Sequence, residues 1–251
     1  MGFEQGRCPW YLRVPAEKYY KNFDARRQYP PYSLLHLQML FDMKLVDPNR
    51  PIDLATICNA NHYDIDPTAN HYGVHLTGDG MDRFCECINI EVQYAREPVI
   101  AAIERHGGRI TTAFFDIASV AALKDPYKFF MSGSPIPKRL LPPPNAIDYY
   151  TDPKNRGYLA DPAEVEIERF KLAQKYGYDI PEIKDEAKRE MLQVRKHKRQ
   201  VFFGLEPGYV VNLKDREILE PVDDDLRDFY GLPSLRMDSS QKDANNQSAQ
   251  I

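Results

Sequence analysis

Cationic and aromatic side chains alternate within the first thirty residues, and these are the groups in the chain best suited to binding a ligand. RNA binding needs cations that neutralise phosphates and planar side chains on which unpaired bases stack. Both kinds occur together here, which predicts an extended RNA-binding arm over residues 1–31. The alternative is that the rings hold the arm against the core while the cations face solvent, and composition favours neither interpretation. The residues predicted to bind RNA in this arm are Arg7, Trp10, Tyr11, Arg13, Lys18, Lys21, Arg26 and Arg27.

Two short basic clusters later in the chain are weaker candidates for the same role. Lys138 and Arg139 form the first cluster, and Lys154 and Arg156 form the second. Short basic clusters are common on any protein surface, so solvated side chains are the simpler interpretation. The basic run over residues 188–199 is typical of a solvated helix face.

Motifs for catalysis are absent. The sequence contains no Gly-x-Ser-x-Gly, no phosphate-binding loop, no His-Glu-x-x-His and no dinucleotide-binding glycine pattern. An enzyme is therefore not expected, and no catalytic residue, metal site, cofactor or small-molecule substrate is predicted. His71 and His75 lack a second ligand pair at a recognised spacing, so ordinary histidines are the better interpretation. Cys85 and Cys87 share one strand face, where small buried side chains explain them more simply than redox chemistry.

Charge is distributed unevenly along the 251 residues, whose formal net charge is −4. A negative sum usually argues against a nucleic-acid partner, but cations gather in residues 1–30 and 184–199. Acids dominate from Asp215 onward, and the aspartates at 223–225 are typical of a solvated or helix-capping turn. Four cysteines without a Cys-x-x-Cys pair favour a reducing compartment. Neither a membrane-spanning apolar run nor a signal peptide is visible, so we expect a soluble protein.

Hydrophobic periodicity changes twice between residues 88 and 115 and predicts a strand, a helix and a second strand. Apolar and polar residues alternate over residues 88–94, as in a half-buried strand. Pro98 suits a first helical turn, and Gly107 suits a helix end. The second strand follows over residues 110–115. Because no nucleophile or paired acid lies here, we expect this unit to form core and to position the N-terminal arm.

Local signals predict further elements before this unit. Ser33 is a candidate cap for a helix that stops near residue 47, and Asp53 is a candidate cap for a short helix through residue 58. A turn at residues 78–80 predicts a hairpin between residues 72–76 and 84–94.

The character of the sequence changes after Phe115, where we place a boundary. Prolines crowd residues 135–144 and forbid long regular elements there. Asp161 and Pro162 predict the start of a helix that Gly177 ends. The remaining predictions are a basic helix over residues 185–196, a hairpin of residues 201–203 with 209–211, and a disordered tail over residues 233–251.

Several short motifs together resemble a known family. The chain opens on Gly2-Phe3-Glu4-x-Gly6-x-x-Pro9-x-Tyr11-x-Arg13-x-Pro15, and its middle contains Ala101-Ala102-Ile103-Glu104 and Gly107-Gly108. These motifs are similar to the signature and to the C-terminal end of large ribosomal subunit protein 15, and the likeness covers about residues 2–113. The segments that resemble the extension of the mitochondrial members are residues 26–29, 112–114, 135–139, 149–152, 155–162 and 202–205.

The resemblance implies a mixed α/β fold, with an irregular strand-helix ribosomal-protein-15 core and a C-terminal helix-plus-hairpin extension. It implies a structural constituent of the mitochondrial large ribosomal subunit, in the matrix, that binds large-subunit rRNA and neighbouring ribosomal proteins. The family's RNA contacts transfer best to the neighbourhood of Arg7, to Tyr11 and to Arg13. The expected divisions are an arm (1–31), a ribosomal protein 15 core (32–115), a mitochondrial-type extension (116–232) and a tail (233–251).

The sequence also departs from the family pattern. Gln5 replaces a family glycine and Arg7 replaces a glutamine, so we expect RNA contacts that differ in detail. Family members normally begin with a long Gly-, Arg- and Lys-rich arm, whereas Met1 stands directly before Gly2 here. A truncated gene model or an unseen first exon is the expected cause, and it would also explain why no import signal is visible. The alternative function is a protein-binding adaptor that has lost contact with rRNA.

Overall fold

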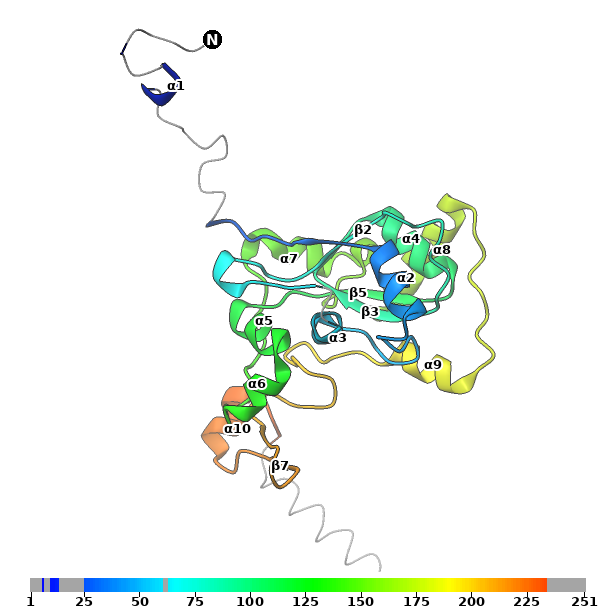
Figure 1. The fold of residues 1–251 in the computed structure, drawn as a ribbon. Helices are drawn as coiled ribbons and strands as arrows, with labels where there is room; N and C mark the ends of the chain where they lie inside the picture. Colours follow the sequence, from blue (N-terminus) through cyan, green and yellow to red (C-terminus); the bar gives the residue numbers. More distant parts are fainter. Residues whose placement is uncertain (1–5, 7–9, 14–24, 61–62, 234–251) are drawn as a thin grey trace, which may run out of the picture.

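A parallel strand–helix–strand unit lies at the centre of the computed structural model, which describes residues 6, 10–13, 25–60 and 63–233 (Figure 1). Strand β3 (Asn89–Val92) pairs in parallel with β5 (Arg109–Thr112), and α4 (Glu97–Arg105) connects them. Pro98 lies in the first turn of α4, and Gly107 follows the helix with a φ of +81°. The predicted strand, helix and strand are therefore confirmed.

The first strand of this unit is buried on both faces, not on one. All four residues of β3 are buried, including Asn89 and Glu91. The Asn89 side chain donates hydrogen bonds to the carbonyls of Met191 (2.9 Å) and Val194 (2.8 Å), which lie about a hundred residues later in the chain. The expectation of a half-buried strand was wrong because this distant segment covers the polar face.

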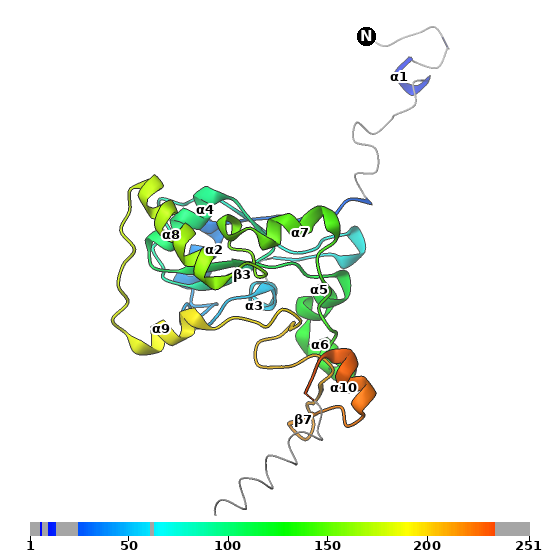
Figure 2. The same ribbon diagram turned by 180° about the vertical axis from the view of Figure 1, so that it is seen from behind.

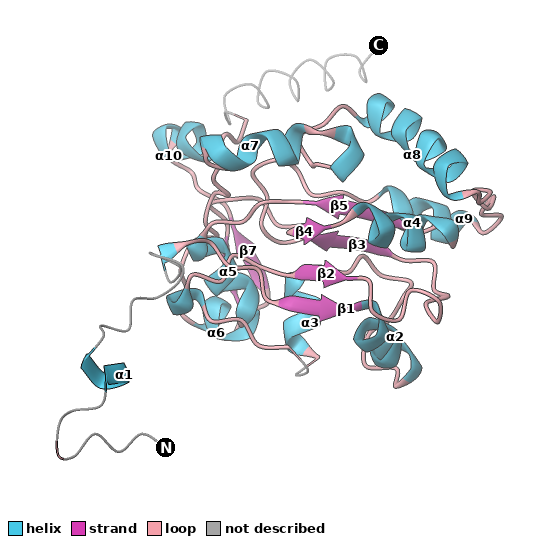
Figure 3. Cartoon of the chain, turned by 90° about the horizontal axis from the view of Figure 1, so that it is seen from above, coloured by secondary structure: helices cyan, strands magenta, loops and turns pink. Residues whose placement is uncertain are grey.

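A second parallel sheet has the strand order β1-β2-β4. Its strands are β1 (Pro31–Ser33), β2 (His75–Thr77) and β4 (Tyr94–Ala95). The predicted hairpin at residues 78–80 is wrong, since β2 pairs in parallel with both neighbours and residues 84–88 form no strand. The turn instead leads the chain past the start of the next helix, where the Leu35 amide donates to the Asp79 carbonyl (2.9 Å). Figure 3 shows the parallel strands side by side.

The two predicted caps in the first half are present. Ser33 caps α2 (Leu34–Asp42) by accepting from the His36 amide, and Asp53 caps α3 (Leu54–Asn59) by accepting from the Thr56 amide. The first helix ends at Asp42, earlier than predicted. A 3-10 turn, η2 (Pro67–Ala69), precedes β2.

Residues 116–233 are richer in helix than the proline content suggests. Proline is compatible with the first turn of a helix, where its missing N–H has no partner, and α6 and α7 both begin on a proline. Asp161 and Gly177 bound α8 as predicted. The elements are α5 (Ile117–Lys124), α6 (Pro126–Met131), α7 (Pro144–Thr151), η3 (Pro153–Asn155), α8 (Pro162–Tyr176), α9 (Glu186–Gln193), β6 (Val210–Asn212), β7 (Glu217–Leu219) and α10 (Asp224–Tyr230).

The C-terminal hairpin lies later than predicted. Strands β6 and β7 pair antiparallel, whereas residues 201–203 form no strand. Val201 and Phe202 are buried, and Phe202 packs against the rings of Phe129 and Phe130. The Tyr209 carbonyl accepts from the Ile136 amide (2.9 Å), so this part of the predicted hairpin pairs with the proline-rich segment.

The two halves of the chain share one hydrophobic core. Ile90 and Ile100 from the first half belong to the same buried cluster as Leu172 and Val201 from the second. Helices α7 and α8 lie along the central strands in both side views (Figures 1 and 2). The division after residue 115 stays a prediction about the sequence. Along the part of the chain that the structure describes, no helix is both long and apolar enough to cross a bilayer.

Candidate nucleic-acid interface

A pocket of about 650 Å³ opens where the N-terminal segment meets α7. Three parts of the chain line it: the segment just before β1, the middle of the first half, and α7. Its polar and aromatic lining residues are Arg26, Arg27, Tyr29, Tyr72, Tyr94, Asn145, Tyr149 and Tyr150.

Three tyrosines of this pocket form a continuous stack. The rings of Tyr29 and Tyr94 lie 6.3 Å apart at an interplanar angle of 27°, and those of Tyr94 and Tyr149 lie 5.1 Å apart at 27°. Tyr150 meets Tyr149 edge to face, with centroids 5.1 Å apart. Stacked rings at a pocket wall are the arrangement on which proteins hold unpaired bases.

Backbone hydrogen bonds hold two of these rings in place. The Tyr149 hydroxyl donates to the Ala95 carbonyl (2.8 Å) and accepts from the Ala95 amide (3.1 Å). The Tyr150 hydroxyl donates to the Gln93 carbonyl (2.9 Å). Burial raises the pKa of both phenols, so they stay protonated and act as donors at neutral pH. The far wall of the pocket is therefore neutral and rigid.

The positive charge of the pocket comes from arginines. Arg26 is exposed, and the Arg27 guanidinium donates to the Asn145 side-chain oxygen (2.6 Å). Arg96 is exposed directly after β4, and burial together with Arg96 lowers the pKa of His75, which is therefore neutral at physiological pH. Within residues 25–60 and 63–233, no carboxylate forms an ion pair with any of these three arginines. They are available to an anionic ligand.

The N-terminal half of the predicted arm gives less structural detail. Arg7, Lys18 and Lys21 lie outside the described residues, as do the side chains of Trp10 and Tyr11. Arg13 is exposed at the end of the short helix α1 (Trp10–Arg13). RNA binding by these residues stays a prediction.

Two of the predicted basic residues are buried and are not retained as RNA contacts. The exposed fraction of both Arg139 and Arg156 is 2%. The Arg139 guanidinium donates to the carbonyls of Phe114 (2.8 Å) and Gln200 (3.4 Å), and it lies 4.0 Å from the Tyr158 ring centroid. A phosphate has no access to either group.

Their neighbours in sequence lie at the surface. The Lys138 ammonium group donates to the Phe229 carbonyl (2.6 Å), which ties it to α10. Lys154 is exposed and lines a pocket of about 200 Å³ with Lys171 and Lys175 from α8. Those two lysines form ion pairs with acids, so this surface has less free positive charge than the tyrosine pocket.

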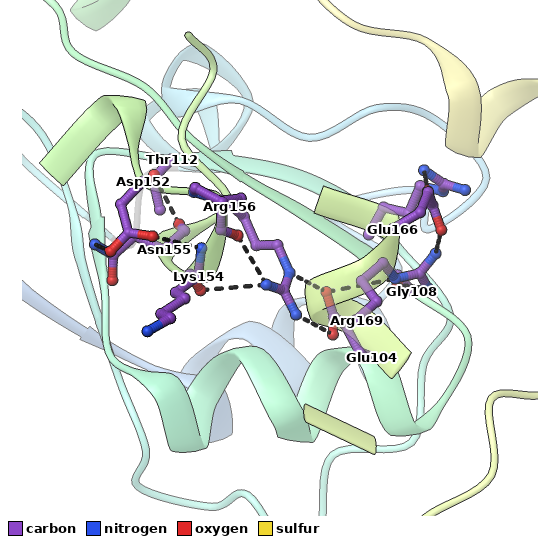
Figure 4. A network of polar contacts seen from close by, with 11 residues as sticks. Glu104, Gly108, Thr112, Asp152, Lys154, Asn155, Arg156, Glu166 and Arg169 are labelled. Atoms are coloured by element: carbon purple, nitrogen blue, oxygen red, sulfur yellow. Dashed lines mark hydrogen bonds and ion pairs between the residues drawn. The ribbon is translucent and has the colours of Figure 1, made fainter. Parts of the chain in front are cut away.

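The buried Arg156 belongs to an ion-pair network that joins α4, η3 and α8 (Figure 4). Its guanidinium contacts both oxygens of Glu104, at 2.7 Å and 2.9 Å, and donates to the Pro153 and Lys154 carbonyls. Arg169 approaches the same carboxylate at 3.5 Å. Gly157, the next residue, passes so close to α7 that a Cβ there would lie 2.1 Å from the Tyr150 carbonyl oxygen. Arg156 therefore positions the wall of the tyrosine pocket.

A second buried cluster surrounds Lys196. Its ammonium group lies 2.8 Å from an Asp53 oxygen and 3.6 Å from a Glu91 oxygen, above the Phe203 ring. Burial by itself would raise the pKa of the Asp53 carboxyl, but Lys196 and the Thr56 donors hold that pKa below its usual range. This cluster joins the residues after α9 to the strand–helix–strand unit.

Metal ligands do not gather in the part of the chain that the structure describes. No three His, Cys, Asp or Glu side chains lie close enough together there to hold an ion. Burial is the largest of the effects that raise the pKa of the Cys58 thiol, to about 12, so it stays protonated.

Comparison with known proteins identifies the family. The family model for ribosomal proteins 50S-L15, 50S-L18e and their 60S counterpart matches residues 31–111. The large ribosomal subunit protein uL15m of Danio rerio is 49% identical over 231 residues, which cover 92% of this chain and 78% of that relative. The chain belongs to the mitochondrial uL15 family. Within this family, uL15m of Neurospora crassa is 27% identical over 63% of this chain and 56% of its own length.

Bacterial uL15 proteins match a shorter part of the chain. The uL15 protein of Acidiphilium cryptum is 35% identical over 111 residues, or 44% of this chain and 65% of that relative. The resemblance found in the sequence is thereby confirmed. The sequence did not point to Tyr72, Tyr94, Arg96 or Asn145 as pocket residues, since they lie far apart in the chain and belong to no shared motif.

Proposed function

We infer that this chain is a structural constituent of the large subunit of the mitochondrial ribosome, where it binds rRNA and neighbouring ribosomal proteins. The observation that carries this conclusion is the similarity to uL15m of Danio rerio over 92% of the chain, which includes both the core and the extension. A ribosomal protein of this kind acts in the mitochondrial matrix and supports translation by holding rRNA in its folded shape. We assign it no catalytic step and no small-molecule substrate.

The tyrosine pocket is the surface best suited to rRNA. Arg26 and Arg96, which pair with no carboxylate among the described residues, offer charge to the phosphate backbone, and the stack of three tyrosines offers a platform for an unpaired base. The pocket also lies at the base of the arm predicted to bind RNA, so both would contact one rRNA region. We propose that Arg13, Arg26, Arg27 and Lys154 contact phosphates, together with the arm residues Arg7, Lys18 and Lys21.

The first test measures affinity for large-subunit rRNA as a function of salt. The double variant Arg26→Gln/Arg27→Gln should bind more weakly, and the slope of log K against log salt should decrease by about 0.7–0.9 for each phosphate that is no longer neutralised. Lys44→Gln/Arg83→Gln removes the same charge from exposed positions near α2 and serves as the control. Equal slopes for the two double variants would contradict the assignment of the pocket.

A second test separates stacking from charge. Tyr29→Leu removes one ring of the stack without changing charge, and stacking contributes about 1–3 kcal/mol per base. We expect rRNA affinity to fall by about fivefold to a hundredfold while the salt slope stays at its original value. Tyr127→Leu, an exposed tyrosine on α6, is the control. A loss that appears only as a changed salt slope would contradict the stacking role.

The alternative adaptor function predicts a different cellular result. Tagged protein expressed with a mitochondrial leader should sediment with the large subunit in mitochondrial extract. Migration only with small soluble complexes, together with intact folding, would exclude a ribosomal role and favour the adaptor.

A further inference from the structure

The last described elements form a small unit at one end of the molecule. Strands β6 and β7 and helix α10 lie beyond α5 and α6, away from α4 and α8, in both side views (Figures 1 and 2). We call residues 206–232 the acidic unit. The tyrosine pocket beside α7 lies nearer the opposite end.

The exposed charge of the acidic unit is strongly negative. Residues 206–232 contain eight acidic and three basic residues. One of the three cations, Arg227, is only 4% exposed and is used internally: it donates to the Pro221 and Pro233 carbonyls and lies 3.7 Å from a Glu220 oxygen. The exposed acids of this unit are Asp215, Glu217, Glu220, Asp223, Asp224, Asp225 and Asp228.

Apolar side chains are exposed among these acids. Val222 is 79% exposed and Phe229 is 61% exposed, and Ile218 and Leu219 on β7 are each about half exposed. Soluble proteins rarely leave apolar groups gathered at the surface unless a partner covers them. Within the described residues, β7 pairs only with β6, so its other edge has free backbone donors and acceptors.

The charge pattern selects among the possible occupants. Phosphates of rRNA would be repelled by this density of carboxylates. A second copy in a two-fold contact would bring the same acids together, since such an interface uses the same patch on both subunits. A basic polypeptide with some apolar side chains complements both the charge and the exposed valine and phenylalanine.

We propose that the acidic unit docks a basic, partly apolar segment of a neighbouring protein of the large subunit. This inference rests on the function proposed above and deepens it, because it assigns the protein-binding role to one end of the molecule and the rRNA role to the other. The uncovered edge of β7 offers the partner backbone hydrogen bonds as well as charge.

Photo-crosslinking in assembled ribosomes tests this proposal. The full chain is expressed with a mitochondrial leader and carries p-benzoylphenylalanine in place of Val222, and adducts are identified by mass spectrometry in large-subunit fractions. The expected adduct is with a single neighbouring protein, at a peptide with excess Lys and Arg. Adducts with rRNA, with a second copy, with residues 234–251 of the same chain or with an acidic peptide would overturn the proposal, as would large subunits without any protein adduct.

Charge reversal gives a second, quantitative readout. Glu217→Lys/Asp225→Lys/Asp228→Lys should lower the adduct yield about tenfold, since each exposed pair contributes modestly and three contributions combine. The matched control, Asp179→Lys/Glu182→Lys/Glu190→Lys, makes the same charge change at exposed positions around α9 and should leave the yield within about twofold. Equal yields from the two triple variants would overturn the proposal.

The two inferences fail in distinguishable ways. A chain that never sediments with the large subunit refutes the proposed function and the docking role with it. A chain that sediments with the large subunit but gives no adduct with a basic protein refutes the docking role alone.

Discussion

Replacing Arg156 with Ala is expected to lower the free energy of unfolding by about 3–5 kcal/mol. The substitution leaves the Glu104 carboxylate, whose side chain is 1% exposed, with only the longer contact to Arg169 at 3.5 Å. Removing one partner of a buried ion pair costs more than the pair contributes, because the remaining charge stays out of water. Urea denaturation followed by circular dichroism measures the loss.

Two further variants show whether burial is the cause. Arg156→Lys keeps the charge but loses the two-pronged contact with Glu104, so we expect an intermediate loss. Lys171→Ala breaks the ion pair with Glu168, where the lysine is 63% exposed, and should cost less than about 1 kcal/mol. A similar cost for Arg156→Ala and Lys171→Ala would contradict a structural role for the buried pair.

Replacing Lys196 with Ala is expected to cost a similar amount, about 3–5 kcal/mol near neutral pH. The lysine side chain is fully buried, and its removal leaves the Asp53 and Glu91 carboxylates without their cation. Asp53 also caps α3, so the loss reaches the helix that begins there. The measurement is again the free energy of unfolding in urea.

This second variant should also change how stability depends on pH. In the parent protein the lowered pKa of Asp53 contributes stability above the unfolded value of about 3.9, and the contribution is lost as pH falls through the folded value. Without Lys196, burial raises the pKa of that carboxyl, and stability is lost as pH rises through it. The difference between variant and parent should therefore be smaller near pH 5 than near pH 7.5, by about 1 kcal/mol or more.

An exposed ion pair provides the control for both effects. Lys124 pairs with Asp64 at 2.8 Å, and the Asp64 side chain is 82% exposed. Because water screens this pair, Lys124→Ala should change the free energy of unfolding only slightly at either pH. If Lys196→Ala showed the same small, pH-independent cost, the buried cluster would not stabilise the fold.

These two clusters explain why the C-terminal half is part of the fold and not an appendage. Arg156 and Lys196 lie after residue 115, yet their carboxylate partners Glu104, Asp53 and Glu91 lie before it. Each buried pair requires both halves in place. We expect truncation after residue 115 to leave three acids buried without a cation or newly exposed, so the first half alone should be poorly stable.

Features that depend on neighbouring residues could be predicted from the sequence. Ser33, Asp53 and Asp161 begin helices because their side chains accept a nearby backbone N–H, and Gly177 ends one because glycine readily adopts a positive φ. The central strand–helix–strand unit has an equally local origin in its hydrophobic periodicity. Family membership was also visible, since it depends on short motifs and not on packing.

Strand pairing and the exposure of the basic residues depend instead on contacts between distant segments. Strand β2 pairs with β1 and β4 and not with the segment that follows its own turn. The exposure of Arg156 depends on Glu104, 52 residues away, and that of Lys196 on Asp53, 143 residues away. No local pattern encodes contacts at such separations, so Arg156 and the exposed Lys154 look alike in the sequence. Burial by distant segments makes one a structural ion and leaves the other free for a ligand.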